Sequence, residues 1–466
     1  MGLLATLARR KPIAELQSDA GRGGGLRRVL GLWQLTAIGL GGIIGVGIFV
    51  LTGTVAANQA GPAVVLSFLI AGVASAAAAL CYAEFAGLIP VSGSAYTYGY
   101  AVLGEFAGWI IGWDLLLEYA LIAAVVAVGW SGYVQALLAA GGIPLPVWAQ
   151  GAWGSAPGRV MNLPAVAISL LITALLATRT EWGARFNTVI VAIKIGAALL
   201  VIAAGVAFVK PANWHPFMPF GMHGVVAGAS IVFFAVFGYD MLTTAAEESE
   251  NPQRDLPRAV VLSLGIAMLL YFAICLVLTG IVPYRTLDNP APVAGAFTAI
   301  GLPRIMIAIS LASICGITSV IFANLLAGAR IWFALSRDGL LPAWFGAVHP
   351  RWRTPFRTTV LLGLVTASAA GIFPLDELAK LVNIGVRGAF IVICSAVTVL
   401  RWRQPELRRP FRTPLMPVTP IVGIGFSFWL ISALPTITYW RFFAWLLIGC
   451  GVYFGYGRRH SLEATR

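Results

Sequence analysis

The chain has 466 residues, of which 59% are hydrophobic and only 11% charged, and its mean hydropathy is +0.87. This composition excludes an ordinary soluble globular domain and is typical of a membrane protein. The net charge of +13 raises the alternative of a nucleic-acid-binding protein. The distribution of the charge excludes it, because the lysines and arginines gather in the short segments between apolar stretches.

A bilayer-spanning helix needs about 20 apolar residues, so roughly twelve helices fit in this length. We expect spans at 33–57, 62–88, 104–138, 163–177, 186–209, 224–246, 257–281, 303–335, 357–371, 376–400, 418–436 and 438–457. With this topology most basic residues fall on one side, which predicts that both termini are cytoplasmic in the cell (inner) membrane and that this side meets anionic lipid. Residues 1–32 are basic and glycine-rich without a cleavable apolar core, so they are expected to be a cytoplasmic tail.

Two of the apolar segments are interrupted near their middles, the first and the sixth. The first carries glycine at positions 39, 41, 42, 45 and 47. The sixth reads FFAVFGYD over residues 233–240, with a glycine and an acid inside an apolar run. Unwound backbone at membrane depth is tolerated where it lines a cavity, and paired interruptions indicate a transporter's binding site. The sequence therefore predicts that this chain moves a small solute.

Rival classes lack the motifs that they need. No zinc-protease, nucleophile-elbow or P-loop pattern occurs, and no selectivity-filter motif suggests a channel. The five cysteines all lie in apolar segments without metal-ligand spacing. We expect no catalytic residue, no metal and no cofactor.

Charged residues inside spans are costly and therefore candidates for function. Lys194 lies mid-span with no acid within a helical turn. A buried lysine without an acidic partner loses its proton readily, which favours a proton carrier over the alternative of snorkelling to the cytoplasmic interface.

The acids of the spans leave more alternatives open. Glu118, one turn after Asp114, fits a carboxylate near the proton path as well as an inter-helix hydrogen bond. Glu84 is expected to form a structural pair. For Asp240, and for Glu247 and Glu248, gating contacts and packing are equally plausible.

Several motifs resemble the amino acid–polyamine–organocation (APC) superfamily, and within it bacterial members of the cationic amino acid transporter (CAT) family. They are GLGGIIGVGIFVLTG at 39–53, YAEF at 82–85, PVSGSAYTY at 90–98, FGYD at 237–240, NPQRDLP at 251–257 and SRDGLLP at 336–342. The resemblance implies an all-α polytopic LeuT-like fold with twelve transmembrane helices, of which helices 1 and 6 are broken at mid-membrane. Residues 33–209 form the first inverted repeat, 224–400 the second, and 401–466 hold two peripheral spans and the C-terminal tail.

The resemblance also implies site residues. The substrate carboxylate is expected at the backbone of Gly45, Val46 and Gly47, and its ammonium at carbonyls of both breaks. Those carbonyls belong to Ile43, Ile44, Phe234, Ala235 and Phe237. Phe234 also acts as a lid, and Ile317 lines the side-chain pocket. Lys194 couples protons with Thr318 or Ser319 as its partner, contacting span-one carbonyls near Ile38 or Gly39.

Two cations depart from the family pattern, Lys380 and Arg387. Both are expected to add positive charge near the cytoplasmic half of the path, with Arg387 facing the cytoplasmic vestibule as a gating or specificity residue. We therefore expect proton-coupled uptake of small or medium neutral L-amino acids by alternating access. The alternatives are a cationic amino acid uniporter and an exchanger. A small membrane accessory subunit is left open. Gly47→Val is expected to abolish substrate binding while leaving insertion and folding largely intact.

Overall fold

The computed structural model describes residues 9–13, 30–90, 94–178, 184–243, 246, 249–352 and 354–461, with backbone alone for 184–187. Most of the expected N-terminal tail, with Glu247 and Glu248, lies outside these residues. The described part is helical throughout and contains no strand, only two isolated bridges, Leu30 with Ser249 and Gln150 with Asn162.

Helices coincide with every expected span. Along the first half they are α3 (Leu32–Ile43), η1 (Gly47–Leu51), α4 (Thr52–Val55), η2 (Ala56–Ala60), η3 (Gly61–Ala63), α5 (Val64–Leu88), α6 (Ser94–Val102), α7 (Glu105–Ala140), η4 (Val147–Ala149), α8 (Leu163–Thr178), α9 (Ala184–Gly205), η5 (Val206–Phe208) and η6 (Pro211–Trp214).

The second half begins with the interrupted sixth segment. Its helices are α10 (Gly221–Val232), η7 (Phe233–Ala235), α11 (Asp240–Thr243), α12 (Pro252–Ile281), η9 (Tyr284–Leu287), α13 (Pro292–Ala299), α14 (Pro303–Arg337), α15 (Phe356–Ile372), α16 (Leu375–Arg403), α17 (Val418–Ser432), α18 (Thr436–Val452), η10 (Tyr453–Gly457) and α19 (Arg458–His460).

Eight helical segments of the described chain are long and apolar enough to cross a membrane. Four shorter apolar helices, α3, α8, α15 and α17, lie at the remaining expected spans. The chain is therefore an all-α protein with many membrane-spanning helices.

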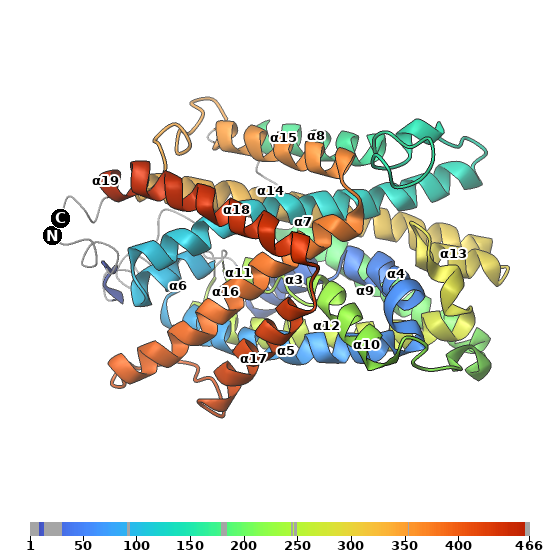
Figure 1. Cartoon of the computed structure of the whole chain (residues 1–466), viewed down its shortest axis with the longest axis horizontal. Helices are drawn as coiled ribbons and strands as arrows, with labels where there is room; N and C mark the ends of the chain where they lie inside the picture. Colours follow the sequence, from blue (N-terminus) through green and yellow to red (C-terminus); the bar gives the residue numbers. More distant parts are fainter. Residues whose placement is uncertain are drawn as a thin grey trace.

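The long helices run side by side in one bundle (Figure 1). Helix α7 packs along α14 and helix α12 along α5. The most apolar window of α7 is 89% buried, whereas that of Thr436–His460 is 17% buried. Helix α7 is thus a central element, and α18 lies at the periphery.

Both ends of the described chain lie at the same end of the bundle, and α13 lies at the opposite end (Figure 1). The Glu105 amide donates to the Arg9 carbonyl at 2.7 Å, and the Ser461 hydroxyl donates to the Glu105 carboxylate at 2.7 Å. Glu105 at the start of α7 therefore fixes segments from both chain ends. We call this the terminal end of the molecule.

Candidate functional site: a cavity between two interrupted helices

The expected interruptions are present in both helices. Helix α3 stops at Ile43, and Ile44 is extended (φ −78°, ψ 105°) before the chain resumes helical turns. The sixth segment passes through the short η7, and Gly238 has φ +118° before α11 begins at Asp240. A positive φ of this size is readily adopted only by glycine, so the FGYD motif fixes where the second interruption ends.

Glycine lets the two interruptions touch. A Cβ on Gly42 would lie 2.6 Å from the Gly238 carbonyl oxygen. A Cβ on Gly47 would overlap the Cβ of Ala235. The glycines therefore serve a backbone crossing, and this geometry argues against the expectation that Gly47→Val leaves folding largely intact.

One hydroxyl joins the interruptions. The Tyr271 hydroxyl of α12 lies 2.7 Å from the carbonyl oxygen of Ile43 and 2.7 Å from that of Ala235. A phenol carries a single donor hydrogen, so it bonds one carbonyl at a time. The Tyr133 hydroxyl likewise donates to the Phe49 carbonyl at 2.7 Å. Sequence reasoning missed both tyrosines, because neither stands in an interrupted segment.

A small cavity lies at this crossing. The expected site residues in its lining are Ile43, Gly45, Val46, Gly47, Phe234, Ala235 and Phe237; the others are Gly42, Ile122, Val126, Gly238, Met241 and Val320. All the side chains in this set are apolar. The free volume is about 10 Å³, close to the smallest space that holds one water molecule. A bound solute therefore requires the walls to move apart.

Two expected binding residues lie outside this lining. The Ile44 carbonyl accepts a hydrogen bond from Lys194, and Ile317 is fully buried one turn before Val320, the residue that α14 contributes to the cavity. Ile122 and Val126 of α7 were not anticipated. Their spacing of four residues places them on one helix face. Because apolar residues at this spacing recur along the whole of α7, the sequence does not single out this pair.

Lys194 is fully buried and caps the broken end of α3. Its ammonium donates to the Gly41 carbonyl at 2.9 Å and to the Ile44 carbonyl at 3.0 Å. These acceptors lie a few residues beyond the expected Ile38 and Gly39. The stem of the side chain passes over Gly316 of α14, where a Cβ would lie 2.7 Å from the Lys194 Cγ. Snorkelling to an interface is therefore not the observed arrangement.

The expected hydroxyl partners of Lys194 bond elsewhere. Ser319 donates to the Gly316 carbonyl of its own helix at 2.8 Å. Thr318 accepts from the Trp130 indole at 2.9 Å and donates to the Ile314 carbonyl at 2.7 Å.

Three buried carboxylates gather in the half of the bundle nearer the terminal end. Asp114 and Glu118 on α7 and Asp240 on α11 are each at most 5% exposed. Tyr119 donates to Asp240 Oδ2 at 3.0 Å, while Asp240 Oδ1 and Glu118 Oε2 are buried without a hydrogen-bond partner. No ion pair within the described residues involves these carboxylates, and no arrangement of His, Cys, Asp and Glu there could hold a metal ion.

The two unexpected cations lie elsewhere than predicted. Lys380 pairs with Asp376 at 2.9 Å near the start of α16, at the end away from the termini. Arg387 is fully buried within the protein, so the expectation that it faces a cytoplasmic vestibule is wrong. Neither cation adds charge to a path at the terminal end.

A wide vestibule opens at the end away from the termini. Two cavities of about 450 Å³ share Gln135, Gln150, Arg159 and Asn289 in their linings. One of them reaches Val50 and Gly129, a single helical turn from Val46 and Val126 of the small cavity. A solute approaching from this side thus comes within one turn of the crossing.

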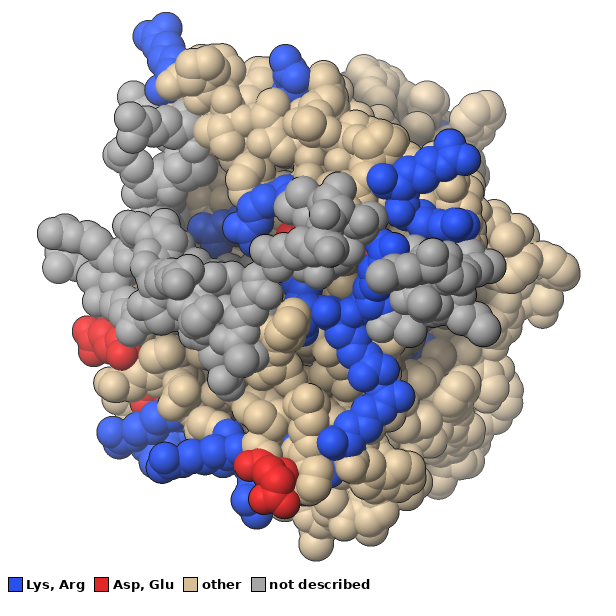
Figure 2. Space-filling model, turned by 90° about the vertical axis from the view of Figure 1, so that its left-hand side faces the viewer, with Lys and Arg blue, Asp and Glu red and all other residues tan. Residues whose placement is uncertain are grey.

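Ionic contacts join the described residues at the terminal end. Lys11 pairs with Asp338 at 2.7 Å, and Tyr96 donates to the same carboxylate at 2.5 Å. Burial, and then the neighbouring Asp338, raise the pKa of Tyr96 well above its ordinary value, so the phenol stays a donor. Figure 2 shows this end of the molecule, where basic side chains are prominent and acidic ones few.

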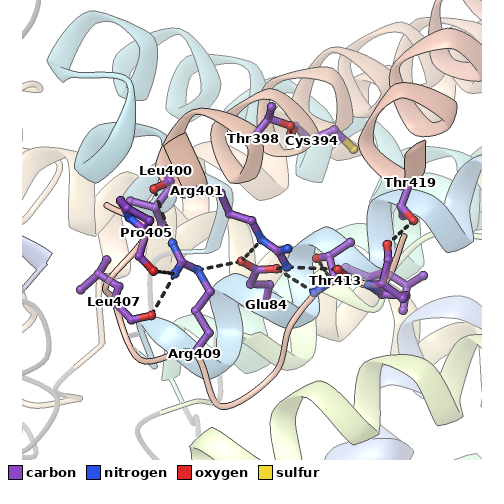
Figure 3. Close-up of polar contacts among 12 residues, drawn as sticks. Glu84, Cys394, Thr398, Leu400, Arg401, Pro405, Leu407, Arg409, Thr413 and Thr419 are labelled. Carbon is purple, nitrogen blue, oxygen red and sulfur yellow. Dashed lines mark hydrogen bonds and ion pairs between the residues drawn. The ribbon is translucent and has the colours of Figure 1, made fainter. Parts of the chain in front are cut away.

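A second ionic cluster at the terminal end surrounds Glu84 (Figure 3). Its carboxylate, 2% exposed, accepts from Arg401 Nε at 3.1 Å and Nη2 at 2.6 Å and from the Thr413 amide at 2.7 Å. Arg409 Nε lies 3.1 Å from Glu84 Oε1, the oxygen that also accepts from Arg401 Nε, and its guanidinium donates to carbonyls that follow α16. The expected structural pairing of Glu84 is therefore confirmed, and it joins α5 to α16.

A helical bundle in which two interrupted helices enclose a cavity is the architecture of a secondary transporter. A sequence profile of the family described as "Amino acid permease" matches residues 30–461. The chain belongs to this family and so to the APC superfamily. It is a transporter and not an enzyme.

Named relatives match nearly the whole chain. The methylthioribose transporter of Bacillus subtilis (strain 168) is 48% identical over 98% of this chain and 99% of its own length. The branched-chain amino acid permease BcaP of the same organism is 45% identical over 97% and 98%. Human cationic amino acid transporter 4 is 36% identical over 86% of this chain and 64% of its own, which agrees with the resemblance to CAT-like proteins.

Proposed function

We propose that this protein is a proton-coupled importer of neutral L-amino acids with aliphatic side chains. The single observation that carries the proposal is the cavity lining, in which backbone groups of two helix ends face apolar side chains of Ile122, Val126, Met241 and Val320. Helix ends offer free backbone donors and acceptors for a carboxylate and an ammonium. Apolar walls suit an aliphatic side chain and leave a second charge unpaired.

The lining also separates this substrate from the alternatives. A cationic side chain needs a carboxylate, and a sugar needs partners for several hydroxyls. The cavity's lining residues include no carboxylate and no polar side chain. The name of the branched-chain permease supports an aliphatic amino acid, while that of the methylthioribose transporter makes this sugar the second candidate.

The architecture that we propose is the LeuT-like one, with twelve spans, inverted repeats at 33–209 and 224–400, and peripheral spans within 401–466. The terminal end faces the cytoplasm, as the basic surface there supports (Figure 2). The vestibule at the opposite end is open, and Lys11 pairs with Asp338 at the terminal end, which supports an outward-facing state.

Within this scheme Lys194 couples protons to transport, and Glu118 is the reserve candidate. The ammonium donates to two carbonyls at the α3 break, so loss of its charge weakens contacts that hold the site. A charge state that stabilises one conformation over another is what coupling requires.

Uptake by the purified protein in proteoliposomes tests the function. We expect labelled leucine to accumulate when the outside is more acidic than the inside, and unlabelled valine to compete better than arginine or methylthioribose. Uptake that follows arginine or methylthioribose instead would overturn the substrate assignment. Leucine uptake that needs internal amino acid but no proton gradient would indicate an exchanger.

A further inference from the structure

One face of α16 contacts the end of α10, where the interruption of the sixth segment begins. Asn383, Arg387 and Phe390 stand four and three residues apart, so they share this face. The Asn383 amide donates to the Ser230 carbonyl at 2.9 Å and to the Ile231 carbonyl at 3.2 Å. The Phe390 ring packs edge-on against Phe233, with centroids 5.5 Å apart.

Arg387 is the centre of this face. Its Nη2 donates to the Ser230 carbonyl, its Nη1 donates to the Leu430 carbonyl at 3.1 Å, and its guanidinium lies 4.8 Å from the centre of the Phe233 ring. The side chain is fully buried. No carboxylate of the described chain pairs with it, so backbone oxygens and one aromatic face balance its charge.

We propose that Arg387 is a positioning residue that holds the broken end of α10 and thereby sets Phe234 over the substrate cavity. The proposal rests on the proposed function for its substrate. Phe234 follows Phe233 directly, lines the cavity and packs against Phe237 at a centroid distance of 6.0 Å. A shift of Ser230 to Phe233 therefore moves the wall of the site.

An arginine suits this place for two physical reasons. The last carbonyls of a helix lack intrahelical donors, and the helix dipole favours positive charge at that end. A guanidinium offers several donors in one plane and keeps its charge when buried. An apolar residue at position 387 would remove one of the two side-chain donors that each of the Ser230 and Leu430 carbonyls has.

The same contact connects a further helix, α17, to the interruption of the sixth segment. The Leu430 carbonyl of α17 accepts from Arg387 and also from the Ser230 hydroxyl, at 2.8 Å. Helices α10, α16 and α17 are thus joined at one node beside the interruption. Movement of α10 during transport is expected to carry α16 and α17 with it.

The first test is the kinetics of leucine uptake in proteoliposomes. We expect Arg387→Met to raise KM by about tenfold, the scale of a lost charged hydrogen bond, with a smaller change in Vmax. Arg387→Lys is expected to recover most of the loss, because it restores the charge. The matched control is Arg441→Met, whose guanidinium forms an exposed pair with Glu377 and whose loss should leave KM unchanged.

The second test does not depend on the substrate. Phe234→Cys is introduced into a chain whose five native cysteines are replaced by alanine. The rate at which a thiol reagent labels this cysteine is then measured with and without the Arg387→Met substitution. Faster labelling with Met is expected, because the lid is no longer held. This result would support the positioning role even if wild-type protein transports no leucine, which would overturn the proposed function alone.

An unchanged labelling rate and an unchanged KM would overturn the proposal. If Arg387→Met does not fold, Arg387→Lys and Asn383→Ala decide it. Each is expected to raise KM and the labelling rate by about threefold, the effect of weakening one hydrogen bond. A wild-type KM and a wild-type labelling rate in both variants would show that these contacts of α16 with α10 and α17 contribute packing only.

Discussion

The contacts of Lys194 connect the protonation state of one side chain to the interrupted end of α3. Its ammonium has carbonyl partners only, Gly41 and Ile44, at the point where α3 loses its regular hydrogen bonds. Without its proton, the amine keeps fewer donors and no charge for the negative end of the helix. The strength of this cap therefore depends on protonation.

Lys194→Ala is expected to abolish accumulation of leucine in response to a proton gradient, because the cap and its proton are both lost. Lys194→Arg keeps a permanent charge and is expected to be inactive in uptake while still folding. The measurement is uptake into proteoliposomes over a range of external pH. If Lys194→Ala still concentrates leucine when the outside is acidified, coupling must be sought at Glu118.

Gly47 and Gly45 are expected to respond differently to the same small change. A methyl group on Gly47 overlaps Ala235, whereas one on Gly45 meets the Val320 side chain at 3.3 Å. Gly47→Ala should therefore reduce the yield of monodisperse protein and lower its melting temperature. Gly45→Ala should fold normally and weaken leucine binding. A Gly47→Ala protein as stable as wild type would contradict the observed crossing.

At the scale of elements, the interruptions could be predicted and their partners could not. Clustered glycines and an acid in an apolar run are local signals, so the ends of α3 and η7 followed from the residues themselves. The residue that α14 contributes to the cavity depends on how this helix is rotated about its axis. A rotation by less than one turn decides whether Ile317 or Val320 lines the cavity. An apolar helix with several similar faces carries no local signal for that rotation.

For a charged side chain too, the partners could not be predicted from the sequence, as Arg387 shows. Its depth in span ten was evident from the sequence, and so was its need for partners. Those partners are backbone carbonyls of α10 and α17. Because every residue has a backbone carbonyl, the amino-acid sequence does not indicate which carbonyls are the partners. Lys380, by contrast, had its partner Asp376 one turn away in the sequence.

The Glu84 cluster gives a prediction for the contact between α5 and α16 (Figure 3). Glu84→Ala leaves the Arg409 and Arg401 side chains, 3% and 22% exposed, without their carboxylate. Breaking a buried pair in this way costs about 3–5 kcal/mol, so the melting temperature should fall clearly. Lys380→Ala removes the partly exposed pair with Asp376 and should change stability by less than about 1 kcal/mol. Equal effects of the two substitutions would show that the cluster is well solvated.

At the scale of the whole molecule, the described residues form an open vestibule at one end and ionic contacts at the other. The vestibule reaches to within a turn of the small cavity, while Lys11 and Asp338 pair at the terminal end. Lys11→Glu places two carboxylates together and should favour opening of that end. A cysteine at Arg159 in the vestibule should then be labelled more slowly than with Lys11→Arg as the control. Unchanged labelling would mean that this pair does not hold the conformation.

The Tyr271 hydroxyl has a consequence for how an empty and a loaded transporter differ. The carbonyl oxygens of Ile43 and Ala235 both lie 2.7 Å from the Tyr271 hydroxyl oxygen, so its one hydrogen can be donated to the first interrupted helix or to the second, never to both together. In the function that we propose, the substrate's ammonium would bring three hydrogens and bond both carbonyls at once. Bound substrate would then hold the two interrupted helices together, which the Tyr271 hydroxyl cannot do alone. Tyr271→Phe removes this hydroxyl, and the melting temperature of this variant should depend on added leucine more strongly than that of the wild type.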